Sequence, residues 1–159
     1  MFGFGEEKNE KYLVAVQTGE VISITKVPDE VFSEKILGDG VAIIPVEDDV
    51  VSPVDGEVIQ VAETNHAYCI RSDDGADILI HIGIDTVNLK GEGFESFVSA
   101  GQKIKAGDLI CKANMKLIKE KGYLTHTVVL IVNMSQIKDM QTVFGDAKIG
   151  ETKIISYKK

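Results

Sequence analysis

The sequence predicts an all-β fold, a distorted antiparallel β-sandwich or barrel built from related hairpin units with short helical turns. Short runs rich in Val and Ile alternate with Gly-containing turns along the chain, which is typical of sandwiches and barrels. The segment Gly-Glu-Val-Ile at residues 19–22 recurs at residues 56–59, which indicates related hairpins. Asp74-Gly75 lies between two β-rich runs and is a strong signal for a tight hairpin turn.

The expected elements follow from the turn residues that separate them. We expect residues 1–11 to be flexible, as chain ends commonly are, and residues 12–159 to form a single domain long enough to bury a core. Pairs such as Thr18-Gly19, Asp55-Gly56 and Gly107-Asp108 separate neighbouring β-rich runs. The expected strands are 14–17, 21–25, 41–46, 50–54, 57–62, 65–71, 77–82, 103–105, 109–112, 128–133 and 153–157. Short helical turns are expected over 115–122 and 135–140.

Composition restricts the class of protein. Of the 159 residues, 44% are hydrophobic, yet no apolar run approaches membrane-spanning length. The first residues do not resemble a signal peptide, so we expect a soluble cytoplasmic protein. A net charge of −8 argues against nucleic acid as a partner and leaves a basic protein partner open. Cys69 and Cys111 do not form a Cys-x-x-Cys or metal-binding spacing, so free thiols in a reducing cytoplasm are expected.

The run from Asp77 to Asp85 contains the main candidate for chemistry. Isoleucines at 78, 80 and 82 alternate with Leu79, His81 and Gly83, which is the period-2 pattern of a half-buried strand. The isoleucines would therefore face the core, and His81 would face the other way. A neutral imidazole on a rigid strand can act as a nucleophile or as a metal ligand.

A second histidine is expected near His81. A two-residue loop at Asp74-Gly75 places Tyr68 opposite His81 and His66 opposite Gly83. His66 would then share the face of His81, with their α-carbons or β-carbons about 7–8 Å apart. A longer loop would shift the pairing by one residue and send His66 to the other face. Thr64 precedes His66 by two residues, so its hydroxyl could hold the His66 ring in one orientation.

Several motifs together resemble a known family. They are Thr-Asn-His-Ala at 64–67, the histidine run at 75–87 and the segment 88–94, with further likeness at 27–32, 38–42 and 51–56. These segments are similar to the glucose-family enzyme IIA component of the bacterial sugar phosphotransferase system. The likeness covers most of the chain from about residue 18 onward.

The resemblance implies a phosphotransferase component that works through a phosphohistidine. The phosphocarrier HPr would donate a phosphoryl group to Nε2 of His81, and a cysteine of a membrane-associated enzyme IIB would then accept it. The resemblance gives His66 the role of stabilising the phosphoryl group and Thr64 that of orienting His66. The carbonyl of Gly83 would accept a hydrogen bond from His81. A regulatory role toward other transport or metabolic proteins is also consistent with the family.

The resemblance also implies a docking surface around the two histidines. Asp29 and Asp85 would face arginines of HPr. The apolar contacts would come from Val31, Phe32, Ile36, Val41, Leu79 and Phe94. We expect a freestanding monomer that approaches the membrane only through its permease partner.

Two other functions stay open, a zinc site at the two histidines and a biotin carrier site at a lysine. Zinc could bind His66 and His81, but catalytic zinc usually has three protein ligands, so a partner would have to complete the site. No cofactor is otherwise expected. Lys116 follows Met115, as the biotin-carrying lysine does in biotinyl carrier domains. Such a lysine sits at a hairpin tip, whereas residues 115–122 predict a helical turn.

Overall fold

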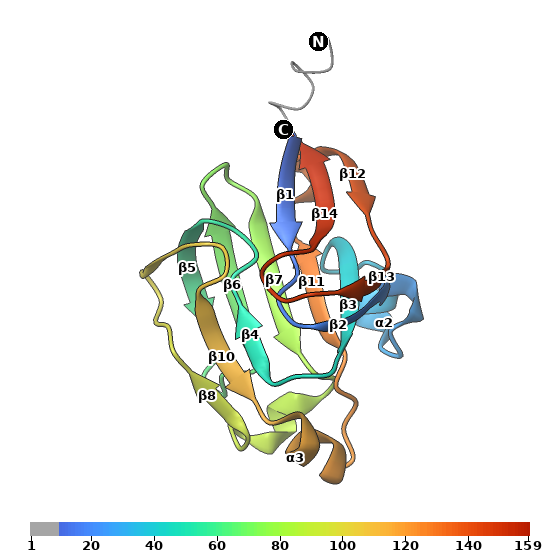
Figure 1. The fold of residues 1–159 in the computed structure, drawn as a ribbon, viewed down its shortest axis with the longest axis vertical. Helices are drawn as coiled ribbons and strands as arrows, with labels where there is room; N and C mark the ends of the chain where they lie inside the picture. The colour runs from blue at the N-terminus through green and yellow to red at the C-terminus, as the bar shows by residue number, and fades with distance from the viewer. Residues whose placement is uncertain (1–9) are drawn as a thin grey trace.

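The computed structural model of the chain describes residues 10–159, as a set of antiparallel sheets with short helices (Figure 1). Strand β1 begins at Glu10, and its residues Glu10 and Lys11 pair with Lys158 and Tyr157. The predicted flexible segment 1–11 is therefore wrong for its last two residues. Its residues 1–9 lie outside the described residues.

The elements are short and are separated by tight turns. The strands are β1 (Glu10–Val14), β2 (Gly19–Ser23), β3 (Asp39–Pro45), β4 (Asp49–Val51), β5 (Gly56–Val61), β6 (Ala67–Ser72), β7 (Asp77–Ile82), β8 (Phe94–Ser96), β9 (Lys103–Ile104), β10 (Leu109–Ala113), β11 (Thr127–Ile131), β12 (Lys138–Thr142), β13 (Gly145–Ala147) and β14 (Lys153–Lys158). The helices are η1 (Ile24–Lys26), α2 (Glu30–Ser33), η2 (Thr86–Leu89), α3 (Met115–Glu120) and η3 (Met134–Gln136).

Within the described residues the strands form three sheets. An 8-stranded sheet has the order β13-β2-β3-β11-β7-β6-β5-β9, and two 3-stranded sheets have the orders β1-β14-β12 and β4-β10-β8. The pairings are antiparallel. The large sheet is open, since β13 and β9 are its end strands. The predicted all-β class with short helical turns is confirmed, and the sheet does not close into a barrel.

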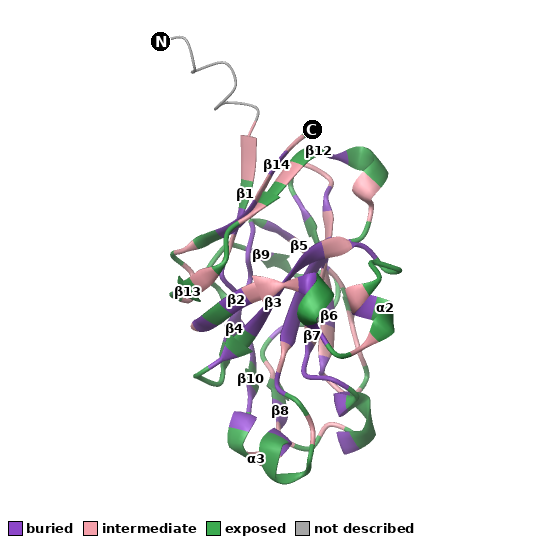
Figure 2. Cartoon of the chain, turned by 90° about the vertical axis from the view of Figure 1, so that its right-hand side faces the viewer, coloured by how far each residue is buried: buried purple, intermediate pink, exposed green. Residues whose placement is uncertain are grey.

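The 8-stranded sheet buries side chains on both faces. One face contributes Ile78, Ile80 and Ile82 to the main core, which also contains residues from both small sheets. Burying an aliphatic side chain of this size stabilises a fold by about 1.5–3 kcal/mol. The other face carries a second core cluster that consists of Ile24, Val27, Phe32, Ala42, Ile84, Val128 and Leu130. Figure 2 shows the mostly buried central strands and, beside them, α2 with both buried and exposed residues.

The structure changes some of the predicted elements. Residues 14–17 are not a strand, because β1 ends at Val14. Residues 135–140 are not helical as a unit, since η3 ends at Gln136 and β12 begins at Lys138. The predicted turn at 115–122 is confirmed as α3, whose first turn is capped by the side chain of Asn114.

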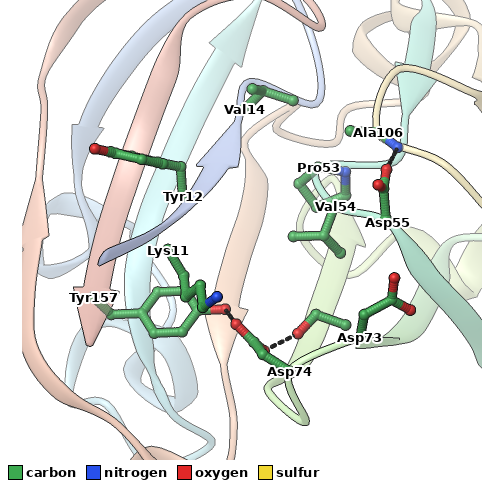
Figure 3. Close-up of a pocket in the computed structure, with 11 residues that line it drawn as sticks. Lys11, Tyr12, Val14, Pro53, Val54, Asp55, Asp73, Asp74, Ala106 and Tyr157 are labelled. Atoms are coloured by element: carbon green, nitrogen blue, oxygen red, sulfur yellow. Dashed lines mark hydrogen bonds between the residues drawn. The ribbon is translucent and has the colours of Figure 1, made fainter. Parts of the chain in front are cut away.

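The C-terminal strand anchors the β6–β7 hairpin. The hydroxyl of Tyr157 donates to a carboxylate oxygen of Asp74 at 2.7 Å, and Figure 3 shows the two side chains pointing toward each other. Asn133 donates from Nδ2 to the carbonyl of Gly75 at 2.9 Å. The hollow beside this contact has a volume of about 320 Å³, and none of the predicted site residues line it. The anchor therefore holds the hairpin from the end opposite to the histidines.

Among the residues that the structure describes, no helix is both long enough and apolar enough to cross a membrane.

Candidate active site

His81 projects from the centre of the large sheet. Its strand β7 lies between β6 and β11, where His81 pairs with Ala67 on one side and with Val128 on the other. Burial alternates along β7, so Ile80 and Ile82 are buried in the main core while His81 and Leu79 are half-buried on the opposite face. The predicted direction of His81 is confirmed, and two flanking strands hold its backbone in place.

The predicted register of the β6–β7 hairpin is wrong. His81 pairs with Ala67 and not with Tyr68. The hydrogen bond from Ser72 N–H to the Ala76 carbonyl closes a loop of Asp73, Asp74 and Gly75. The longer loop shifts every pair by one residue relative to a two-residue turn. Cys69, which pairs with Leu79, consequently lies on the face of His81 and is only partly buried.

His66 nevertheless lies beside His81, because of a backbone feature that strand alternation does not predict. Strand β6 begins only at Ala67, and the preceding Asn65 has a positive φ of 59°. The carbonyl of His66 still accepts from the N–H of Ile82 at 2.8 Å, but strand alternation no longer decides where its ring points. The two imidazole centroids are 5.0 Å apart, and the ring planes are nearly perpendicular at 84°.

Each ring is held through Nδ1. The Nδ1 atom of His81 is 2.9 Å from the carbonyl oxygen of Gly83. Since a carbonyl only accepts, Nδ1 of His81 carries the proton, and a neutral ring then has its lone pair on Nε2. The Nδ1 atom of His66 is 2.6 Å from the hydroxyl oxygen of Thr64. The structure thus brings together the four residues predicted for the chemistry.

Both imidazoles favour the neutral state. Burial lowers the pKa of His66 to about 4, with a further contribution from the neighbouring charge of His81. Burial also lowers the pKa of His81. The hydrogen bond to Gly83 and the charges of Asp29 and Asp85 act in the opposite direction and only partly offset it. Near neutral pH the site therefore contains two uncharged rings.

The second core cluster forms one wall of the site. The ring of Phe32 is 5.0 Å from the His81 ring between centroids, with an interplanar angle of 58°. Phe32 is buried in α2, and Leu79 packs against the same cluster. Helix α2 begins after Asp29, whose carboxylate accepts from the N–H of Val31 at 3.0 Å. Asp29, an N-cap residue directly after Pro28, is a signal from which α2 could have been predicted.

The predicted docking residues differ in their accessibility. Val31 and Ile36 are 41% and 66% exposed, so contact with a partner stays a prediction for both. Val41 is 0% exposed and Phe94 is 8% exposed, and both belong to the main core. For these two residues the prediction is wrong. Val41 pairs with Val129 in the large sheet, and Phe94 pairs with Ala113 in a small one, so both side chains face inward.

Three exposed apolar side chains in neighbouring segments of the chain were not predicted. Leu37 lies four residues after the end of α2, Val87 is the second residue of η2, and the carbonyl of Leu124 accepts from the N–H of Ile84. Large aliphatic residues within polar turns were the available signal, because such residues are normally buried. Whether they also contact a partner stays a prediction.

The structure bears on the two alternative functions, zinc binding and a carrier lysine. No group of three or more His, Cys, Asp or Glu residues within residues 10–159 could hold a metal ion. His66 and His81 alone supply two nitrogens, so a zinc ion would need ligands from a partner. Lys116 is the second residue of helix α3 and not the tip of a hairpin. That position does not suit a carrier lysine.

Comparison with known proteins identifies the family. The family described as "phosphoenolpyruvate-dependent sugar phosphotransferase system, EIIA 1" matches residues 11–137. A Bacillus cereus protein named "PTS system glucose-specific EIIA component" is 46% identical over 156 residues, covering 98% of this chain and 94% of the relative. The Haemophilus influenzae protein of the same name is 41% identical over 160 residues, covering 100% and 96%. The solved structure of glucose permease IIA from Mycoplasma capricolum has a TM-score of 0.86 and 35% identity, covering 92% of this chain and 95% of that one. The chain therefore belongs to the enzyme IIA family of the phosphoenolpyruvate-dependent sugar phosphotransferase system.

Proposed function

We propose that this protein is a phosphocarrier that accepts a phosphoryl group from phospho-HPr on Nε2 of His81 and passes it to a cysteine of enzyme IIB. The observation that carries the proposal is the hydrogen bond from His81 Nδ1 to the Gly83 carbonyl. It leaves Nε2 as the nucleophilic atom of a neutral ring beside a second imidazole. Family membership supports the same chemistry. The names of the relatives make a glucose permease the first partner to test.

In the accepting step, the lone pair of His81 Nε2 attacks phosphorus. The P–N bond to the histidine of HPr breaks, and its electron pair returns to that histidine. His81 then carries a phosphoryl group and a positive charge, which its Nδ1–H shares with the Gly83 carbonyl. In the donating step, a thiolate of enzyme IIB attacks phosphorus, the P–Nε2 bond breaks, and His81 becomes neutral again. Each step exchanges similar bonds, so positioning and electrostatic stabilisation supply most of the catalysis.

His66 has a different role in this scheme. When the Thr64 hydroxyl donates to Nδ1 of His66, the neutral ring carries its proton on Nε2. That N–H can donate to phosphoryl oxygens on the neighbouring His81 ring, where negative charge is concentrated during transfer. A pKa of about 4 keeps His66 in this neutral donor form at the pH of a cytoplasm. We place the protein there because HPr and the soluble part of its permease partner are found there.

The test is phosphorylation by phosphoenolpyruvate, enzyme I and HPr, followed by intact mass, acid lability and peptide mapping. We expect one acid-labile, alkali-stable phosphoryl group on His81, which His81→Gln and His81→Ala abolish. Stable labelling of His81→Ala at another residue would refute the assignment of the nucleophile. Biotin or lipoate on Lys116 in the same mass spectrum would favour the carrier function instead.

His66→Gln is the matched control for His81→Gln, because the same substitution is made in the neighbouring ring. The nucleophile is retained, so we expect His66→Gln to accept a phosphoryl group from HPr. Loss of the positioned donor should slow donation to enzyme IIB by about 10²–10³-fold. Thr64→Ala should act in the same direction more mildly, since it only releases the His66 ring. Donation by His66→Gln at the wild-type rate would show that His66 is not needed for transfer and would favour a zinc role completed by a partner.

A further inference from the structure

The turn that follows β7 decides which nitrogen of His81 is free. Gly83 is the first residue after the strand, and its carbonyl accepts from Nδ1 of His81 at 2.9 Å. If that carbonyl pointed elsewhere, His81 would lose the acceptor that keeps its proton on Nδ1. The direction of one peptide group therefore matters for the chemistry at the neighbouring ring.

Hydrogen bonds from outside the turn hold the peptide groups on both sides of Gly83. The N–H of Gly83 donates to the carbonyl of His126 at 2.9 Å, and the N–H of Ile84 donates to the carbonyl of Leu124 at 3.0 Å. The carbonyl of Ile82, in the same peptide group as the Gly83 N–H, accepts from the hydroxyl of Thr86 at 2.5 Å. Of these three bonds, the bond from Thr86 is the one made by a side chain.

Thr86 is also packed against Gly83. Its side chain is completely buried, and a β-carbon added to Gly83 would collide with its Cγ2 atom. Gly83 has a φ of +78°, a conformation that glycine adopts without strain. The hydroxyl and the methyl of Thr86 thus contact two different parts of the same turn.

We propose that Thr86 is a positioning residue that keeps neutral His81 in the tautomer with a free Nε2, acting through the peptide groups on either side of Gly83. This inference rests on the proposed function of His81. Without the hydroxyl, the buried carbonyl of Ile82 has lost its side-chain donor, which is unfavourable. The Ile82–Gly83 peptide group can relieve this by rotating, and Gly83, which offers little resistance to backbone rotation, passes the change on to the Gly83–Ile84 peptide group. The Gly83 carbonyl then turns away from His81, and the tautomer with the proton on Nε2, which cannot attack phosphorus through Nε2, becomes populated.

The chain offers a closely matched control. Thr127 pairs directly with Ile82 across the strands β11 and β7 and is also 0% exposed. Its hydroxyl has no hydrogen-bond partner among the described residues. Thr127→Val therefore makes the same chemical change as Thr86→Val, next to the same residue, without removing a bond to the turn.

The experiment measures the His81 tautomer by nitrogen NMR of the imidazole and, separately, the rate of phosphoryl acceptance from phospho-HPr. We expect wild type, Thr86→Ser and Thr127→Val to show His81 protonated on Nδ1. Thr86→Val should show a mixture of tautomers and accept about 10-fold more slowly, the smaller loss usual for a residue that acts through another. Rescue by Thr86→Ser would show that the hydroxyl, and not the methyl, is responsible.

The proposal is overturned if folded Thr86→Val keeps the wild-type tautomer and rate. It is also overturned if Thr86→Ser changes the tautomer and the rate as much as Thr86→Val does. If Thr86→Val does not fold, Thr86→Cys replaces it, because a thiol has a similar size and is only a weak donor. It should give an intermediate tautomer ratio, and a wild-type ratio would count against the proposal. The NMR measurement requires no phosphoryl donor. A wild-type protein that fails to accept phosphate would therefore contradict the proposed function. The role of Thr86 would still be decided by the His81 tautomer in the Thr86 variants.

Discussion

Substitution of Gly83 by alanine should destabilise the fold through two separable effects. The backbone φ of +78° costs an L-residue about 1–2 kcal/mol. The new β-carbon would collide with Cγ2 of Thr86 and lie 3.2 Å from the carbonyl oxygen of Leu124. Thr86 is completely buried and cannot move into solvent, so we add the about 1–3 kcal/mol that is typical of overpacking. The free energy of unfolding should fall by about 2–5 kcal/mol in total.

A second substitution separates these effects. Thr86→Ser removes the Cγ2 atom that meets the new β-carbon and keeps the hydroxyl that binds the Ile82 carbonyl. In the double variant the overpacking is relieved while the backbone strain remains. The double-mutant cycle should therefore show a favourable coupling between Gly83→Ala and Thr86→Ser of about 1–3 kcal/mol.

Urea unfolding followed by circular dichroism measures all four corners of the cycle. Gly101→Ala is the control for backbone strain, because Gly101 has a φ of +93° and its added β-carbon would meet nothing within 4 Å. We expect Gly101→Ala to lose about 1–2 kcal/mol. If Gly83→Ala cost no more than Gly101→Ala, or if the cycle showed no coupling, the packing of Thr86 against Gly83 would not constrain this turn.

Three further predictions concern buried polar groups. Thr127→Val should raise the free energy of unfolding by about 1 kcal/mol, measured in urea, because the buried Thr127 hydroxyl has no partner in the described part of the chain. Tyr157→Phe should cost about 1–3 kcal/mol at pH 7 by removing a donor to Asp74. Burial raises the pKa of Asp74, but hydrogen bonds from Ser72 and Tyr157 lower it by more, so the cost should shrink as pH falls through that pKa. His66 has a folded pKa of about 4, below its ordinary 6.5, so the unfolded chain binds this proton first as pH falls. The stability present above pH 6.5 should therefore decrease by about 2 kcal/mol at pH 5 through His66. His66→Gln should lose about that much less than wild type when unfolding at pH 7 and pH 5 is compared, since burial also lowers the pKa of His81 and that contribution remains.

The sequence was sufficient to predict which way a side chain faces where a single alternating strand pattern decides it. Isoleucines at 78, 80 and 82 required a core on one side of β7, so His81 had to face the other way. The position of His66 was predicted correctly from an incorrect register. The loop contains one more residue than the Asp74-Gly75 turn implied, and the positive φ of Asn65 takes His66 out of the strand. Neither feature has a clear signature in the order of residues.

The covering of the large sheet on both faces explains the other differences between the predicted and the observed site. The large sheet is covered on both faces, and alternation shows that neighbouring residues face opposite ways without showing which layer covers each face. Val41 and Ala42 illustrate this, since Val41 belongs to the main core and Ala42 to the second cluster. Phe32 was expected to contact a partner. Its side chain is instead almost fully buried and packs beside the His81 ring, where it attaches α2 to the sheet.

The charges around His81 suit a site that is completed by its partner. Asp29 and Asp85 raise the pKa of His81 against the larger effect of burial, and both would repel the negative oxygens of a phosphoryl group bound there. If HPr is the donor, as we propose, a basic surface of HPr would neutralise this repulsion when it docks, and the repulsion would return when HPr leaves. A phosphoryl group accepted in this way would then be destabilised electrostatically on His81. This destabilisation would favour onward transfer to a second docked protein, which the proposed phosphocarrier function requires.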